Sequence, residues 1–155
     1  VITHVGYAPP EARDQKLARD LRLLELDLQE KPGDPFILFN LASAHHEAGR
    51  YHEALQCAQA SIQASHPSDS IVRKLYALAA QCQTKLGDTS GALNTLQEGK
   101  KIYPNDAELL FTEGALRLEN RDYQGAISVY RTLLQSEDRP HFGSVVEGLR
   151  GSKGK

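Results

Sequence analysis

The chain has 155 residues, of which 25% are charged and 40% are hydrophobic, and its formal net charge is −2. A chain of this length can bury a continuous core without disulfides or metal ions. A slightly acidic charge excludes the clustered basic surface that binding to nucleic-acid phosphates requires, so we expect no nucleic-acid partner.

Residues 1–10 are interpreted as the end of a preceding domain and a linker. Residues 1–7 alternate weakly in polarity, as the end of a strand does, and the run Gly-Tyr-Ala-Pro-Pro at 6–10 comes next. The chain contains no Met, although translation starts with one, so we expect a fragment of a longer protein. No signal peptide opens it and no apolar run reaches the roughly 18 residues of a membrane span, so we expect a soluble, cytoplasmic protein without a membrane partner.

Residues 11–32 are predicted to form a leading helix that caps the helices after it. Its apolar residues recur at the spacing of one helix face, and two further leucines broaden that stripe. The stripe consists of Leu17, Leu21, Leu24 and Leu28, broadened by Leu23 and Leu26. The run Pro-Gly-Asp-Pro at 32–35 ends the helix.

Residues 33–138 contain a segment that recurs three times. Ala54, Ala92 and Ala126 stand at equivalent places, 38 and then 34 residues apart. A period near 34 predicts stacked helical hairpins, because one such unit cannot bury its apolar face without a neighbour. The hairpins are expected at about 35–66, 71–104 and 107–138, with first helices near 35–48, 71–86 and 107–120 and second helices near 51–64, 89–102 and 123–136.

The turn inside each hairpin needs a residue that tolerates a positive φ. Gly49 and Gly87 meet this need in the first two hairpins, and Asn120 is the expected substitute in the third.

Residues 139–155 are predicted to form a short trailing helix and a disordered tail. The helix is indicated by the spacing of Phe142, Val145, Val146 and Leu149, and the tail begins at Gly151.

The three units resemble tetratricopeptide repeats, whose signature places small residues where the two helices of a hairpin cross. The matching small pairs are Ala42 with Ala54, Ala80 with Ala92, and Gly114 with Ala126. The bulky and remaining signature positions fall on Leu38, Leu41, His45, Ala58 and Ser61, on Tyr76, Ala79, Leu96, Gly99 and Pro104, and on Leu110, Tyr130 and Leu133. The resemblance implies an all-α, right-handed solenoid of antiparallel helical hairpins, the superhelix of this family, which binds other proteins.

Three positions depart from the signature. Gln83, Glu113 and Arg117 are polar where the signature is apolar or aromatic, and the third unit is affected most.

A second resemblance precedes the repeats. It lies in residues 3–7, Thr-His-Val-Gly-Tyr, in residues 16–25, Lys-Leu-Ala-Arg-Asp-Leu-Arg-Leu-Leu-Glu, and in residues 32–41, Pro-Gly-Asp-Pro-Phe-Ile-Leu-Phe-Asn-Leu. These segments are similar to the junction of bacterial family-2 glycosyltransferases, where a nucleotide-sugar-dependent catalytic domain meets a tetratricopeptide tail. Asp20 departs from the family pattern, which commonly has Asn there. The resemblance implies that His4 would lie near the metal and diphosphate of the parent enzyme.

No catalytic constellation accompanies that histidine. The sequence has no Asp-X-Asp metal motif, and the stretch Gly-Asp-Thr-Ser-Gly at 87–91 is expected to be a hairpin turn rather than a phosphate loop. His45, His46, His52 and His66 lack partners at metal-ligand spacing, and His45 occupies a buried signature position. Cys57 and Cys82 have no paired spacing and are expected to be buried thiols in a reducing compartment. We therefore expect no enzyme activity, cofactor or metal in this chain.

The candidate binding surface is the groove formed by the first helices of the hairpins. Its exposed residues are predicted to be Phe36, Phe39, Ser43, His46 and Glu47, then Lys74, Ala77, Leu78, Gln81 and Lys85, then Glu108, Phe111, Thr112, Ala115, Leu118 and Glu119. A floor of Phe39, Leu78 and Phe111 would suit an apolar peptide or helix face. The alternative is that Phe36 and Phe39 only pack against the leading helix.

One class of partner is excluded by the residue types. Repeats that clamp the acidic C-terminus of chaperones use lysine, asparagine and arginine at groove positions. Here those positions fall on Phe39, Ser43, Leu78, Glu108 and Thr112, and Glu108 would repel a carboxylate.

Two functional hypotheses stay open. In the first, the concave groove recruits a separate protein, a peptide or the acceptor substrate. In the second, the array is structural, and packs in cis on a catalytic domain or mediates self-association.

Overall fold

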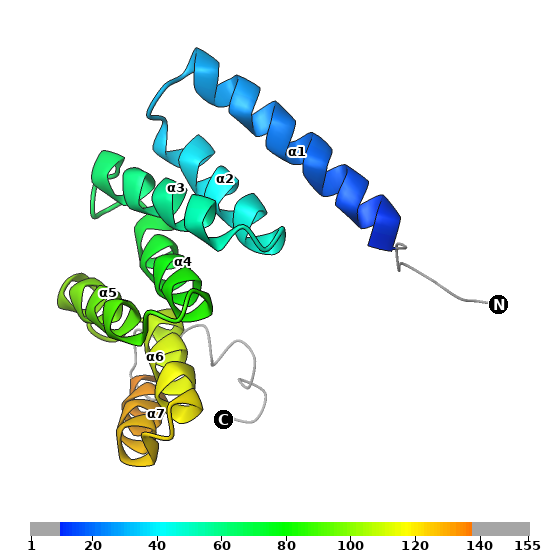
Figure 1. The fold of residues 1–155 in the computed structure, drawn as a ribbon. Coiled ribbons are helices and arrows are strands. Elements are labelled where there is room, and N and C mark those ends of the chain that lie inside the picture. Colours follow the sequence, from blue (N-terminus) through cyan, green and yellow to red (C-terminus); the bar gives the residue numbers. More distant parts are fainter. Residues whose placement is uncertain (1–9, 138–155) are drawn as a thin grey trace, which may run out of the picture.

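The computed structural model describes residues 10–137, which form seven helices and no strand within that range (Figure 1). The helices are α1 Pro10–Glu30, α2 Pro35–Glu47, α3 Tyr51–Ala64, α4 Ile71–Lys85, α5 Thr89–Ile102, α6 Ala107–Glu119 and α7 Tyr123–Glu137. The prediction of an all-α fold is confirmed over this range. The strand end expected before Tyr7 and the helix expected at 142–149 lie outside the described residues.

The helices form three sequential antiparallel pairs. α2 packs on α3, α4 on α5, and α6 on α7, while α4 also contacts α2, α3 and α6 (Figure 1). The first helices α2, α4 and α6 therefore contact one another in succession. This arrangement is the helical solenoid that the repeat period predicts.

Small residues occupy the helix crossings. Ala42, Ala54, Ala80 and Ala92 are completely buried, and Ala126 is almost completely buried. Because these side chains end at Cβ, the backbones approach closely and the larger neighbours interdigitate between them. One core cluster contains Leu75 with Ala42, Ala58, Ile71 and Ala79, and the next contains Leu96 and Leu109 with Ala77, Ala80, Ala92 and Leu116.

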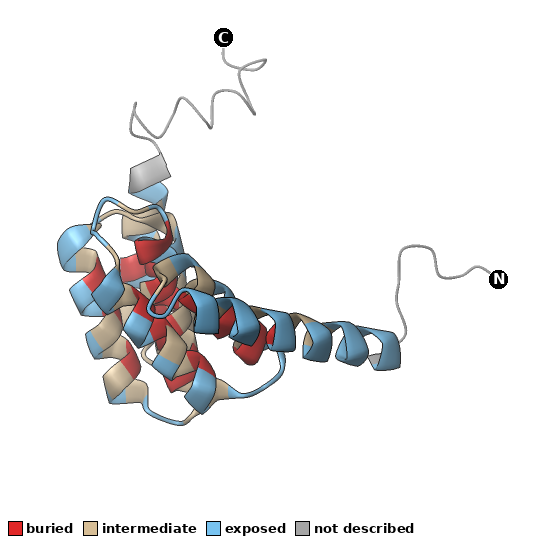
Figure 2. Cartoon of the chain, turned by 90° about the horizontal axis from the view of Figure 1, so that it is seen from above, coloured by how far each residue is buried: buried red, intermediate tan, exposed pale blue. Residues whose placement is uncertain are grey.

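The leading helix α1 packs on α2 through the predicted stripe. Leu21 is buried against Leu41 and Ala44, and the other stripe residues Leu17, Leu24 and Leu28 pack around it. Leu23 and Leu26 expose about half of their surface, 53% and 52%, so the prediction that they broaden the stripe is wrong. They lie off the buried face, and the N-terminal part of α1 extends away from the hairpins (Figure 2).

Aspartates fix where the helices begin. The carboxylate of Asp34 accepts hydrogen bonds from the backbone N–H groups of Phe36 and Ile37, at 2.9 and 3.1 Å. Asp88 and Asp106 cap α5 and α6 in the same way. Each cap satisfies backbone donors that have no partner within the helix.

The three hairpin turns use the same backbone conformation. Gly49 has a φ of 80° and Gly87 a φ of 84°, as expected. In the third turn Arg121 takes the positive φ, 64°, and Asn120 has a φ of −94°, so the prediction for Asn120 is wrong. Arg121 precedes Ala126 by the same number of residues as Gly49 precedes Ala54, so the repeat register determines the position. The Asn120 side chain instead donates to the Leu116 carbonyl at 2.8 Å.

Within residues 10–137 no helix combines the length and the apolar character that crossing a bilayer requires.

Candidate functional site

The predicted groove residues lie on the first helices, and several of those on α4 and α6 line a common cavity. This cavity of about 160 Å³, which we call the α4–α6 cavity, is lined by Gln81, Thr84, Lys85, Phe111, Thr112, Ala115, Leu116 and Glu119. Six of its lining residues belong to the predicted set: Gln81, Lys85, Phe111, Thr112, Ala115 and Glu119. The structure thus brings these six residues together, whereas Lys74, Leu78, Glu108 and Leu118 do not line this cavity.

Phe111 is the most prominent apolar residue of this cavity. Its side chain is 59% exposed, although it lies on a helix that also carries the fully buried Leu109 and Leu110. An edge-to-face contact with Tyr130 of α7, with ring centroids 6.2 Å apart, holds the ring in place. A held, exposed aromatic ring is the type of residue that dominates binding energy in protein interfaces.

The N-terminal half of the predicted surface is arranged differently. Phe36 is 53% exposed, whereas Phe39 and Leu78 are half-buried and pack on the core cluster around Leu75. Phe39 therefore packs on the core that α2, α3 and α4 share. Ala77 is completely buried in the neighbouring cluster, so its prediction as a groove residue is wrong.

Ser43 and Glu47 belong to a separate cavity. This cavity of about 430 Å³ lies between α1 and α2, and its walls include Leu17, Leu23 and Asn40. The leading helix thus extends over one side of α2, and the predicted residues of α2 do not join those of α4 and α6 in one cavity.

Charges of both signs lie along α4 and α6. Lys74 and Glu108 stand near the starts of these helices, and Lys85 and Glu119 near their ends. Burial raises the pKa of Glu108, and Asp106 adds to this while Lys74 opposes it. Burial also lowers the pKa of His46, and the nearby Lys85 lowers it further. The surface therefore has no uniformly basic patch.

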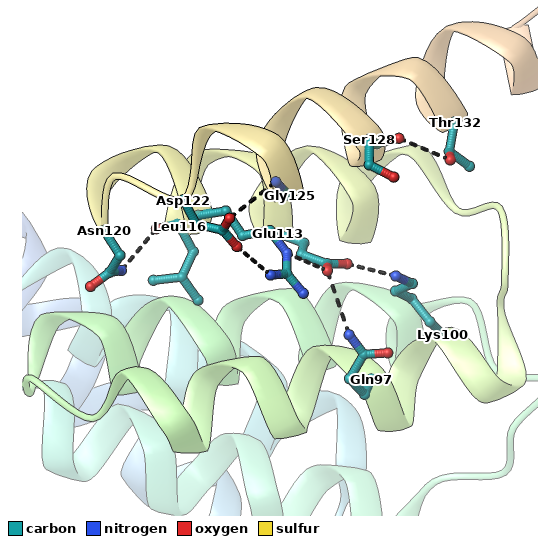
Figure 3. A network of polar contacts seen from close by, with 10 residues as sticks. Gln97, Lys100, Glu113, Leu116, Asn120, Asp122, Gly125, Ser128 and Thr132 are labelled. Carbon is teal, nitrogen blue, oxygen red and sulfur yellow. Dashed lines mark hydrogen bonds and ion pairs between the residues drawn. The ribbon is translucent and has the colours of Figure 1, made fainter.

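The polar departures from the repeat signature form hydrogen-bonded contacts between helices. The Oε1 atom of Gln83 accepts a hydrogen bond from the Thr95 hydroxyl at 2.7 Å. Glu113 is 1% exposed and is held from two sides. Its Oε1 atom lies 2.7 Å from Nζ of Lys100, and its Oε2 atom lies 2.8 Å from Nε of Arg117 (Figure 3).

Arg117 extends this network to the next turn. Its Nη1 atom lies 2.7 Å from Oδ2 of Asp122, whose other oxygen accepts the backbone N–H of Gly125. Burial lowers the pKa of Arg117, but hydrogen bonds to Glu113 and Asp122 outweigh it, so the pKa is raised overall. The sequence indicates part of this network, because the acidic Glu113 and the basic Arg117 stand four residues apart on one helix, at positions where the signature is apolar or aromatic.

The histidines and cysteines that the structure describes are not clustered as metal ligands. Among residues 10–137 no group of three or more His, Cys, Asp or Glu side chains is placed to hold a metal ion. Burial lowers the pKa of His45, and its Nδ1 atom has no hydrogen-bond partner. Burial raises the pKa of the Cys82 thiol to about 11 and also raises the pKa of the Cys57 thiol. Both cysteines are therefore neutral thiols near pH 7.

Two stretches of the chain match models of the tetratricopeptide repeat, residues 37–65 and residues 75–106. No curated protein matches the sequence.

Solved structures with a similar fold include a crystal structure of MamA, with a TM-score of 0.68 and 12% identity over 87% of this chain and 75% of that one. A second is a MamA RS-1 double mutant, with a TM-score of 0.68 and 14% identity over 82% of this chain and 71% of that one. A third is a chain of the APC/C hetero-tetramer Cut9-Hcn1, with a TM-score of 0.67 and 17% identity over 78% of this chain and 22% of that one. At these identities the likeness concerns the fold. The matched stretches lie in the first two hairpins, so the chain contains two stretches of tetratricopeptide repeat within an all-α helical solenoid.

Proposed function

We propose that this chain is a non-catalytic interaction module that binds a protein or peptide partner in the groove of the first helices, at the α4–α6 cavity. Tetratricopeptide repeats indicate protein–protein interaction in general. The observation that supports the groove is the α4–α6 cavity, where the exposed ring of Phe111 stands beside Gln81 and Thr112. An apolar side chain of the partner would cover Phe111, while the two polar side chains pair with its backbone.

The experiment compares two phenylalanines of similar exposure. Peptides that bind the chain are selected from a random library, and their affinity is measured by fluorescence anisotropy. Phe111→Ala is expected to weaken binding at least tenfold, because it removes the anchor. Phe36→Ala, on α2 and outside the α4–α6 cavity, is the matched control and is expected to leave the affinity within about twofold. Equal losses in both variants would contradict the proposed site.

Phe39 is not a suitable test of binding. It packs on the core cluster around Leu75, so its truncation would lower stability as well as any affinity. Melting temperatures of the Phe111 and Phe36 variants separate the two effects in the experiment above.

A second candidate function is a structural array that self-associates or packs in cis on another domain. It is supported by α7, where Tyr123, Ile127 and Leu134 are exposed to between 52% and 62% and recur on one helix face. Sedimentation at micromolar concentration tests this candidate. Self-association that disappears in an Ile127→Glu, Leu134→Glu double variant would support it, and a monomer at all concentrations would argue for recruitment in the groove.

We also propose that the parent protein is a cytoplasmic bacterial glycosyltransferase of family 2. The similarity in residues 3–41 supports this, and His4 lies outside the described residues. The coding sequence upstream of Val1 tests the proposal, because an Asp-X-Asp motif in a nucleotide-binding domain is expected there. The chain itself is expected to show no turnover of a nucleotide sugar.

A further inference from the structure

A second cavity lies among the helices α5, α6 and α7, away from the α4–α6 cavity. Its volume is about 350 Å³, and its lining includes Lys100, Glu113 and Arg117. Figure 3 shows the hydrogen-bond network around Glu113. The polar lining residues are Gln97, Lys100, Glu113, Arg117, Ser128 and Thr132. We call it the α5–α7 cavity.

The charges that line this cavity are unequal. Lys100 and Arg117 are cationic, and Glu113 is the single carboxylate among the lining residues. Asp122 binds the other side of Arg117 but is not part of the lining. The lining residues therefore include one more cation than carboxylates, and Asp122 balances this charge from outside the lining.

Both cations have hydrogen-bonding capacity left. Lys100 gives one bond to Glu113, and an ammonium group has further donors. Arg117 uses Nε toward Glu113 and Nη1 toward Asp122, which leaves its Nη2 group unused. Each of these side chains is 24% exposed, whereas that of Glu113 is only 2% exposed. The buried carboxylate thus holds two partly exposed cations that line the cavity and keep unused donors.

The remaining lining is apolar and suits a short carbon chain. Pro104, Leu110 and Val129 line the cavity beside the charged wall. Glu113 and Asp122 already balance Lys100 and Arg117, so a singly charged anion brings less uncompensated negative charge into this partly buried site than a phosphate dianion would.

We propose that the α5–α7 cavity binds a carboxylate group, with Lys100 and Arg117 as its hydrogen-bond donors. The carboxylate comes either from an acidic side chain of a partner protein or from a small organic acid. Charge-assisted hydrogen bonds of this kind are about twice as strong as neutral ones. In the first case the repeat stack has a second contact surface on its α5 and α7 side, independent of the groove.

The test is an NMR titration of the ¹⁵N-labelled chain at constant ionic strength. The probes are butyrate, as a free acid, and the peptide acetyl-Gly-Glu-Gly-amide, as a protein-borne carboxylate, with acetyl-Gly-Gln-Gly-amide as the uncharged match. We expect saturable shifts at the amides of Gly125, Ser128 and Thr132 with the acids and none with the glutamine peptide. Tighter binding of butyrate would identify a small acid as the ligand, and tighter binding of the glutamate peptide a partner side chain.

Variants separate the site from general charge. Lys100→Met is expected to raise the dissociation constant at least tenfold, and Lys101→Met, which changes the adjacent exposed lysine, to leave it within twofold. Lys100→Arg should restore binding. Ser128→Phe places a bulky ring at the exposed edge of the cavity without removing a charge, and should abolish binding at an unchanged melting temperature.

Three results would overturn the proposal. These are shifts that never saturate, equal affinities in the Lys100 and Lys101 variants, and inorganic phosphate binding more tightly than butyrate. The groove is tested independently, because Phe111→Ala leaves the lining of the α5–α7 cavity intact.

Discussion

The ring of Tyr130 occupies the space where a side chain at Gly114 would begin. A Cβ atom at Gly114 would lie 2.6 Å from Cζ of Tyr130, well inside van der Waals contact. The same ring contacts Phe111, the exposed residue of the α4–α6 cavity. Because Gly114 has no side chain, the ring of Tyr130 fits at this crossing and can contact Phe111, the proposed anchor.

Gly114→Ala is expected to destabilise the fold. Alanine favours a helix over glycine by about 1 kcal/mol, but overpacking a filled crossing costs about 1–3 kcal/mol, so the net effect is a loss. Urea denaturation measures it. Tyr130→Leu should relieve the clash, so the double variant is expected to lose less than the two single losses added together. A Gly114→Ala protein as stable as the wild type would show that this crossing is not close-packed.

Arg121→Gly is expected to stabilise the third turn. A non-glycine residue in the left-handed region costs roughly 1–2 kcal/mol, and the greater freedom of glycine in the unfolded chain offsets part of this gain. The expected increase in the free energy of unfolding is therefore roughly 0.5–1 kcal/mol. Gly87→Ala, at the equivalent position of the second turn, should change the stability in the opposite direction. Urea denaturation of both variants checks the sign.

Glu113→Gln is expected to cost about 3 kcal/mol, because it leaves Lys100 and Arg117 without their shared buried carboxylate. Glu98→Gln, at an exposed position of α5, serves as the control and should change little. Thermal unfolding at low and high salt provides the measurement. Similar small losses in both variants would mean that the network contributes no net stability.

The stability should fall on acidification because of His45 and His46. The pKa values of both histidines in the fold lie below the ordinary value of 6.5. For His45 burial is the main cause and the charge of Arg50 adds to it, while Glu53 and Glu25 oppose the shift. For His46 burial is again the main cause, and the charge of Lys85 adds to it. The unfolded chain therefore binds more protons, so this contribution is complete above about pH 6.5 and decreases as the pH falls below it. Melting temperatures at about pH 7.5 and pH 5 measure the decrease.

His45→Phe removes one of these groups and its unpartnered Nδ1 atom, and should make the pH dependence shallower. His52→Gln, an exposed residue on α3, is the control. If the melting temperature of the His45→Phe variant depended on pH as steeply as that of the wild type, the imidazole of His45 would not be the source of the pH dependence.

The sequence was sufficient to predict the helices and their pairing. The small residues recur at a fixed interval because each helix crossing needs them, and the observed helix ends lie within two residues of those expected for α2 to α7. The third turn was predicted wrongly because asparagine is the commoner substitute for glycine, while here the register places Arg121 there.

The candidate surface was less predictable. A first helix of a repeat packs on both neighbouring helices, so the periodicity alone does not show that Ala77 is buried or that Phe39 packs on the core shared by α2, α3 and α4. The α5–α7 cavity depends on side chains from three helices, among them Lys100 and Glu113, which the sequence separates. Lys100 and Glu113 come together because α5 packs on α6, and the repeat pattern does not give the contacts of individual side chains.

The contact of α1 with α2 affects the order in which we expect the helices to unfold locally. This helix packs on α2, and its side chains from Glu11 to Lys16 are all exposed. In a linear stack each unit is stabilised by its neighbours, so an end unit with one neighbour opens at a lower free energy than the middle. The amide protons of α1 should therefore exchange with solvent deuterium well before those of α4, which has neighbours on both sides.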